Sequence, residues 1–140
     1  MHKILIINGP NLNLLGNRET NFYGNTTLDK IKSLCEEQCK KHKIECVFFQ
    51  SNHEGELIEK IHSVDNRFSG IIINPAAYTH TSIALLDALR ASNKPKIEIH
   101  ISNIYAREEF RKKSLLSENC KAVICGLGLD SYKAALLTLK

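Results

Sequence analysis

Two titratable side chains on one face of a predicted strand are the first sign of chemistry in this sequence. Residues 96–102 read KIEIHIS, in which isoleucines alternate with Glu98 and His100. Side chains two residues apart in a strand point to the same face, so the carboxylate is a candidate partner for the imidazole. Such a pair suits acid–base chemistry. The alternative is an edge strand with one face in water, where both side chains are merely solvated.

A second polar group follows the most apolar run of the chain, in residues 70–82, GIIINPAAYTHTS. The three isoleucines predict a strand that is buried on both faces. Pro75 ends the strand because it has no N–H for the ladder. Asn74, Tyr78 and His80 then lie at the carboxyl end of a central strand, where open α/β sheets bind ligands. They could equally be ordinary turn residues.

A helix is predicted to begin at about His80. Three hydroxyl residues can cap it: Thr79, Thr81 and Ser82. Asp87 would then lie two turns along the same side as His80. Three apolar residues would share the buried face: Ile83, Leu86 and Leu89.

The connection over residues 9–25, GPNLNLLGNRETNFYGN, is longer than most loops and is typical of a lid or a binding loop. It contains neither phosphate-loop motif. Tyr23 could act as a base if its pKa fell from about 10 to about 7, which corresponds to about 4 kcal/mol. The guanidinium of Arg18 could supply this at about 4 Å once the loop closes and expels water. The alternative is a surface tyrosine and a solubilising arginine.

The hydrophobic periodicity predicts five strands that alternate with helices. The strands are expected at residues 3–7, 44–50, 71–73, 96–102 and 122–125. The helices are expected from Thr26 or Thr27 to about Lys43, after a capping box at Ser51–Glu54, from about His80 and from about Ser131. This pattern is typical of a three-layer, doubly wound α/β fold with the flavodoxin-like strand order 2-1-3-4-5. Asn11, Asn74, His80, Glu98 and His100 would then surround one crevice.

The length, charge and hydropathy of the chain argue against a nucleic-acid-binding protein and against a membrane protein. A chain of 140 residues is expected to form a single domain over residues 1–140. The net charge of +4 comes with one basic cluster, residues 40–43, which has no interleaved aromatic residues, so no nucleic-acid partner is expected. No segment has the ~20 apolar residues of a membrane span. We therefore expect a cytoplasmic protein that does not bind membranes.

The cysteines and histidines do not suggest a metal or a disulfide framework. Five cysteines without C-x-x-C spacing are expected to be reduced core thiols. His80 and His100 have no third ligand at credible spacing. The glycines at 126 and 128 are expected to be turn residues rather than a cofactor site. No metal or cofactor is predicted.

Five segments carry a resemblance to a known family: GPNLNLLGNRETNFYG, SNHEGELIEKIH, IIINPAAYTHTSIALLDAL, EIHISNIYAREEFRKKS and VICGLG. In this order, over nearly the whole chain, they closely resemble the signature segments of type II 3-dehydroquinate dehydratase, a shikimate-pathway enzyme. The resemblance implies a flavodoxin-like domain, usually assembled as a dodecamer of trimers. It implies the loss of water from 3-dehydroquinate to give 3-dehydroshikimate, without metal or cofactor.

The resemblance also implies roles for single residues. Tyr23 matches the base, and Arg18 matches the arginine that keeps it ionised. Asn11 matches the residue that steadies the enolate through a water. His100 matches the donor that protonates the departing hydroxyl, and Glu98 is placed to orient it.

Further positions match substrate contacts. The backbone N–H groups of Ile101 and Ser102 match a carboxylate site. Three side chains match ring-hydroxyl contacts: Asn74, His80 and Arg111. Asp87 matches a residue that similar enzymes supply at a subunit contact.

The chain departs from the family at a few positions. The family often has proline at Thr20, glycine at Ala76, histidine at Tyr105 and a histidine pair at residues 112–113. The rival function is a flavodoxin-like module that binds a flavin or signals by phosphorylation. The missing phosphate loop and the absence of acidic residues around the end of the first strand disfavour it.

Overall fold

The computed structural model of the chain describes residues 2–17 and 25–139. Five parallel strands form one sheet in the order β2-β1-β3-β4-β5. The strands are β1 (Lys3–Asn8), β2 (Glu45–Gln50), β3 (Phe68–Asn74), β4 (Lys96–His100) and β5 (Ala122–Cys125). The predicted flavodoxin-like order is confirmed.

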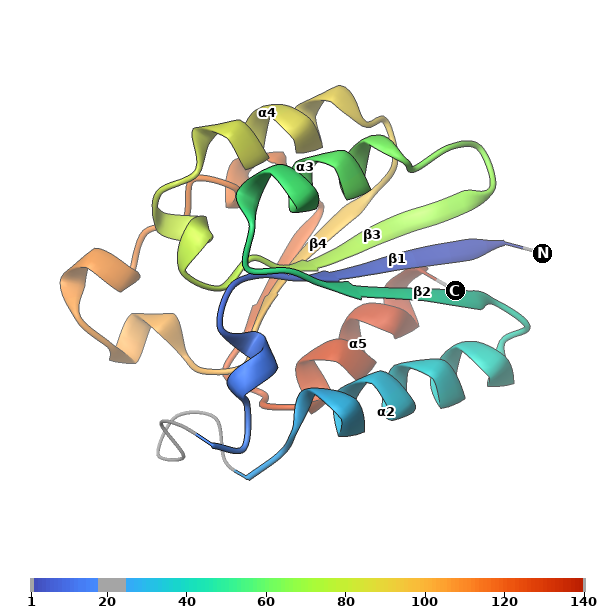
Figure 1. Cartoon of the computed structure of the whole chain (residues 1–140), viewed down its shortest axis with the longest axis horizontal. Helices are drawn as coiled ribbons and strands as arrows, with labels where there is room; N and C mark the ends of the chain where they lie inside the picture. The colour runs from blue at the N-terminus through green and yellow to red at the C-terminus, as the bar shows by residue number, and fades with distance from the viewer. Residues whose placement is uncertain (1, 18–24, 140) are drawn as a thin grey trace.

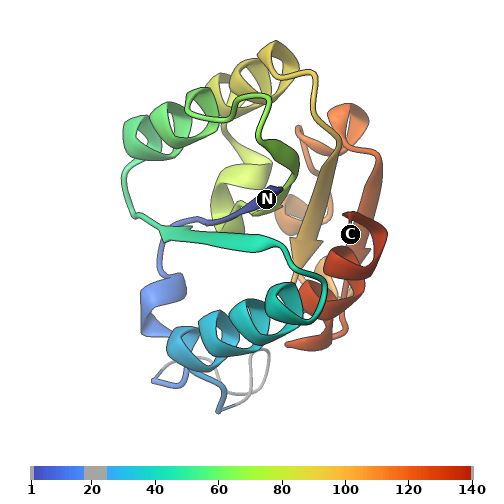
Figure 2. The same ribbon diagram turned by 90° about the vertical axis from the view of Figure 1, so that its right-hand side faces the viewer.

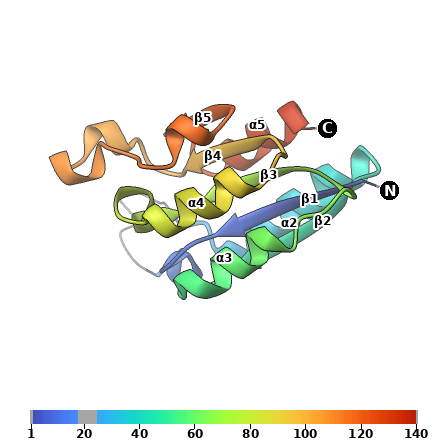
Figure 3. The same ribbon diagram turned by 90° about the horizontal axis from the view of Figure 1, so that it is seen from above.

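Helices cover both faces of the sheet (Figure 1). The helices are α2 (Leu28–Lys41), α3 (Glu54–His62), α4 (Ile83–Ala91) and α5 (Asp130–Leu139). Figure 2 shows α2 and α5 on one side of the sheet, and Figure 3 shows α3 and α4 on the other. No helix in the described ranges is long and apolar enough to cross a membrane.

Short 3-10 turns occur in the segments that follow β1, β3 and β4 (Figure 1). They are η1 (Leu12–Leu14), η2 (Ala76–His80), η3 (Ile104–Ala106), η4 (Glu109–Arg111) and η5 (Ser117–Asn119). The last three belong to residues 101–119, which we call the 101–119 segment. The predicted irregular connection after β1 therefore contains a helical turn, which buries Leu12 in the core.

The sheet interior accounts for the unusual strand at residues 96–102. β4 pairs with β3 on one side and with β5 on the other, so the edge-strand alternative is wrong. Glu98 is fully buried and His100 is 5% exposed. A carboxylate in this position must be satisfied by protein groups rather than by water.

The capping box predicted at Ser51–Glu54 is wrong. His53 is the N-cap residue of α3, and its side chain makes no capping bond to the described residues. Ser51 accepts a hydrogen bond from the His53 N–H at 2.9 Å and donates one to Glu56. Glu54 accepts from Ser82, so this polar pair joins separate segments instead of closing one helix end.

The predicted helix near His80 begins three residues later. Residues 76–80 form η2, and Ser82 caps α4 by accepting from the Leu85 N–H at 2.9 Å. His80 and Asp87 therefore do not share a helix face, as the pattern had suggested. Ile83 is 64% exposed instead of lying in the core.

The turns that follow β1 and β3 lie against each other. The Gly9 N–H donates to the Asn74 carbonyl at 2.8 Å. A Cβ atom at position 9 would lie 2.4 Å from the Pro75 carbonyl oxygen, so no side chain fits there. The next residue in the β3 turn, Ala76, has a φ of 53°, in the left-handed region.

Replacement of Ala76 by glycine is expected to stabilise the fold. A left-handed backbone destabilises a residue with a Cβ by about 1–2 kcal/mol, which glycine avoids. Glycine also has more conformational freedom in the unfolded chain, and this offsets about 0.4–1 kcal/mol of the gain. Urea unfolding of Ala76→Gly should show a gain of about 0.5–1 kcal/mol. Ala77→Gly is the matched control, since φ of Ala77 is not positive, and it should lose stability. Equal losses in both variants would contradict the strain argument.

Candidate active site

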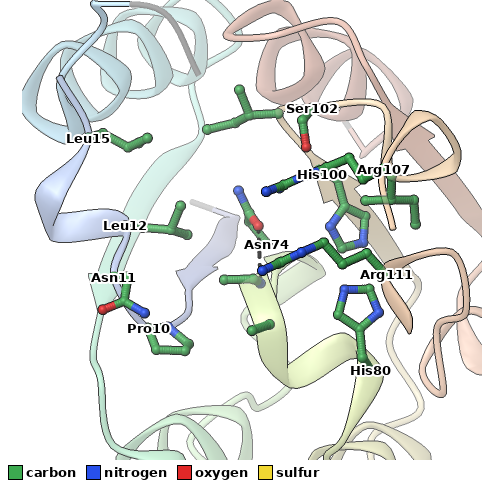
Figure 4. A pocket seen from close by; sticks show the side chains of 14 residues that line it. Pro10, Asn11, Leu12, Leu15, Asn74, His80, His100, Ser102, Arg107 and Arg111 are labelled. Carbon is green, nitrogen blue, oxygen red and sulfur yellow. Dashed lines mark hydrogen bonds between the residues drawn. The ribbon is translucent and has the colours of Figure 1, made fainter. Parts of the chain in front are cut away.

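A cavity of about 110 Å³ opens at the carboxyl edge of the sheet, among residues that follow β1, β3 and β4. In Figure 4, Asn74 lies between a wall formed by residues 10–15 and a wall that carries His100, Arg107 and Arg111. The cavity brings together seven of the predicted site residues: Asn11, Asn74, His80, His100, Ile101, Ser102 and Arg111. This is the crevice that the strand order predicts.

The other predicted site residues lie elsewhere. Glu98 does not line the cavity but lies behind His100, inside the protein. Asp87 is exposed on α4 and does not line the cavity. Arg18 and Tyr23 lie outside the described residues.

His100 and Glu98 form a close pair. Their side chains leave the same face of β4, and His100 Nε2 lies 2.5 Å from Glu98 Oε2. A carboxylate can only accept, so Nε2 carries the hydrogen. The ring is thereby oriented, and Nδ1 is the nitrogen left for the cavity that His100 lines.

Three hydroxyl groups complete the surroundings of Glu98. Ser117 and Ser114 donate to Oε1 at 2.8 and 3.0 Å, and Thr79 donates to Oε2 at 2.9 Å. Thr79 comes from η2 and the serines come from the 101–119 segment. The bonds to Glu98 therefore hold two segments of the cavity wall on β4.

The pKa of Glu98 reflects a balance. Burial alone would raise it, but the hydrogen bonds from His100, Ser117 and Thr79, with the charge of His100, together hold the pKa of Glu98 below its ordinary value. Glu98 is therefore an anion at neutral pH. It can hold positive charge on the imidazole of His100.

The wall that carries His100 also presents cationic and donor groups. Arg107 and Arg111 both line the cavity, and Arg111 Nε donates to Glu108 at 2.9 Å. His80 Nδ1 donates to the Lys113 carbonyl at 2.7 Å, which leaves Nε2 as the acceptor of the neutral ring. Two guanidinium groups at one cavity favour an anionic ligand.

Backbone donors follow the end of β4. Among the described residues, no hydrogen bond is made by the N–H of Ile101 or of Ser102, and both residues line the cavity. Successive N–H groups at a strand end are a common way to bind an anion.

Asn11 holds an uncommon backbone conformation. Its φ is 69°, and its N–H donates to Asn52 Oδ1 at 2.9 Å. Asn52 Oδ1 also accepts from Gln50, whose amide reaches the Gly9 carbonyl. The β1 turn is thus tied to the end of β2.

Sequence reasoning missed several residues that support the site: Asn52, Thr79 as a partner of Glu98, Arg107, Ser114, Ser117 and Tyr132. Thr79 was expected only as a helix cap. Most of these residues contact partners far away in the sequence, so no local spacing indicates them. The signal that could have found them is the buried charge of Glu98, which requires donors from somewhere in the chain.

The prediction of core thiols is confirmed only for Cys35 and Cys39, since Cys46, Cys120 and Cys125 are half-buried. All five lie in the described ranges and are free, and Cys35 and Cys39 are buried. Burial raises the pKa of the Cys35 thiol to about 12, which makes it unreactive at neutral pH. The described residues contain no group of three or more His, Cys, Asp or Glu side chains that could hold a metal ion.

The fold and the site define a flavodoxin-like α/β protein with a buried carboxylate–imidazole pair beside a cavity that two arginines line. The family model for class II dehydroquinases matches residues 2–140. The chain belongs to this family. The assignment does not favour a flavin-binding or signalling module.

Named relatives agree with this assignment. The 3-dehydroquinate dehydratase of Caldicellulosiruptor saccharolyticus is 54% identical, over 100% of this chain and 97% of that protein. The catabolic 3-dehydroquinase of Talaromyces marneffei is 53% identical, over 97% of this chain and 78% of that protein. The crystal structure of type II dehydroquinase from Butyrivibrio crossotus superposes with a TM-score of 0.96 at 49% identity, over 99% and 97% of the two chains.

The lowered pKa of Glu98 predicts a pH-dependent stability. Its ionised form stabilises the fold above the unfolded pKa of about 4.5, and this contribution is lost as pH falls through the lower folded pKa. In guanidinium unfolding at pH 7, the free energy of unfolding of wild type should therefore be well above that of Glu98→Gln. The difference between the two free energies should narrow toward pH 3. Exposed Glu59→Gln is the control and should follow wild type. A gap that stays constant with pH would contradict the assignment.

Proposed function

We propose that the chain converts 3-dehydroquinate to 3-dehydroshikimate by eliminating water. Membership of the class II dehydroquinases and relatives named 3-dehydroquinate dehydratase support this reaction. One observation within the site carries the proposal furthest: a buried, ionised carboxylate orients an imidazole at the wall of a cavity that two arginines also line. This arrangement suits protonation of a leaving hydroxyl on an anionic substrate.

In the proposed complex, the substrate carboxylate accepts from the N–H groups of Ile101 and Ser102. Asn74, His80 and Arg111 contact the ring hydroxyls. Their common position around one cavity supports these assignments. These contacts hold the ring between Asn11 and His100. Both proton transfers require this position of the ring.

The first step is removal of the proton beside the ketone. Tyr23, as the phenolate, takes this proton, and the C–H electron pair forms the enolate. Arg18 keeps Tyr23 ionised, and it follows the cavity residue Leu15 by three positions in the chain. Asn11 steadies the enolate oxygen through a water.

The second step is loss of the hydroxyl group. The enolate oxygen re-forms the ketone carbonyl, and the electron pair of the enolate C=C forms the new C=C bond as the C–O bond breaks. His100 gives its proton to the departing oxygen. The overall elimination is anti, and water leaves. Glu98 holds the positive charge that His100 carries before it donates. This route needs neither a metal nor a cofactor.

We also propose that residues 1–140 act as one domain within a homo-oligomer, a dodecamer built from trimers, in the cytoplasm. The position of Asp87 supports a subunit contact. Its side chain is exposed on α4 and does not line the cavity of its own subunit. It would then complete the site of a neighbouring subunit.

Incubation of the purified protein with 3-dehydroquinate tests the function. The product contains a conjugated enone, so ultraviolet absorbance should rise with time, with and without a chelator. Tyr23→Phe and Arg18→Ala should each abolish this rise and leave the circular dichroism spectrum unchanged. Near-normal turnover of either variant would require a different base.

His100→Ala is expected to impair turnover more than binding. General acid catalysis contributes about 10²–10⁴-fold, so kcat should fall within that range while KM changes little. Steady-state kinetics measures both constants. A loss confined to KM would assign His100 to substrate binding instead.

A further inference from the structure

Tyr132 is a fully buried tyrosine that the proposed reaction does not use. Its ring comes from α5 and is 0% exposed, while its hydroxyl reaches the carboxyl ends of β1 and β3. There it lies 2.6 Å from Asn8 Oδ1 and 3.0 Å from Asn74 Nδ2. Burial raises the pKa of the Tyr132 phenol, although the hydrogen bond from Asn74 opposes this, so the phenol keeps its hydrogen at neutral pH.

A backbone carbonyl determines which groups donate and which accept in the hydrogen bonds of Tyr132. Asn8 Nδ2 donates to the Phe49 carbonyl at 3.1 Å, which can only accept. The oxygen of Asn8 therefore faces Tyr132 and takes its single hydroxyl hydrogen. Because that hydrogen is used, the Tyr132 oxygen can only accept from Asn74.

The same direction is fixed from the other end by a backbone N–H. Ala76 donates its N–H to Asn74 Oδ1 at 3.2 Å, and an N–H can only donate. Both ends therefore give the same orientation of the Asn74 amide. One hydrogen of Nδ2 bonds to Tyr132, and the second hydrogen is left for the cavity that Asn74 lines.

We propose that Tyr132 is a positioning residue that fixes the amide of Asn74, so that this side chain presents an N–H donor to the substrate. Without the phenol oxygen, the amide loses the partner that holds its nitrogen. The consequence for recognition is that Asn74 selects an oxygen with a free lone pair at this point of the ring. The kinetic part of this inference rests on the proposed function.

A double-mutant cycle in steady-state kinetics tests the positioning role. Loss of one hydrogen bond corresponds to about tenfold in affinity. Tyr132→Phe and Asn74→Ala should each raise KM for 3-dehydroquinate about tenfold, with much smaller changes in kcat. The double variant should be no worse than Asn74→Ala alone, because the phenol acts through Asn74.

A purely structural role would give a different result. Ala135→Gly is the matched control, since Ala135 is also buried on α5 and glycine lowers helix stability. It should lower the midpoint of thermal unfolding and leave KM unchanged. Effects of Tyr132→Phe and Asn74→Ala on KM that multiply in the double variant would overturn the proposal, as would a normal KM for Tyr132→Phe.

The same cycle in urea unfolding tests the hydrogen bond without any activity. Here too the double variant should lose less stability than the sum of the two single variants, and additive losses would overturn the proposal. A wild-type protein with no dehydratase activity would contradict the proposed function. The unfolding cycle would still test the hydrogen bond between Asn74 and Tyr132. Should Tyr132→Phe not fold, Asn8→Ala removes the acceptor of the phenol and should show the same coupling to Asn74→Ala.

Discussion

A carboxylate that is wholly shielded from water must find its hydrogen bonds within the protein, and Glu98 imposes this requirement on the whole site. The donors arrive from His100 on the same strand, from Thr79 after β3, and from Ser114 and Ser117 in the 101–119 segment. These bonds compensate the burial of the charge. They reinforce the backbone contact between the β3 turn and the 101–119 segment, and the cavity lies between these parts of the chain and the β1 turn.

A second polar network holds Asn74, which lies between the two walls of the cavity. It runs from the Phe49 carbonyl through Asn8 and Tyr132 to Asn74. Each member has one direction of donation, so the network resists rotation of its amides. The two networks have different roles. The network around Glu98 maintains a negative charge that can stabilise a protonated imidazole. The neutral network around Tyr132 maintains the orientation of its side-chain amides.

The fold could be predicted from the sequence because its signals are local. The apolar run in residues 71–73 and the spacing of Ile31, Cys35 and Cys39 report directly on burial, and the structure confirms them. The alternation in residues 96–102 predicts the strand but not its burial, since both faces of β4 are buried. The start of α4 was predicted too early, because several hydroxyl residues compete for one cap and local pattern does not decide among them. The failed capping box has the same origin, since the serine and the glutamate each found a more distant partner.

The site was predictable only in part, for a related reason. Most of the predicted cavity residues lie at or just after strand ends, whose positions the fold determines, whereas Tyr132 and Ser117 act through contacts across the chain. The tight approach of Gly9 to Pro75 couples the two turns that carry these cavity residues. A chain that lost this glycine would displace the β1 turn and the β3 turn together, and so both sides of the cavity floor.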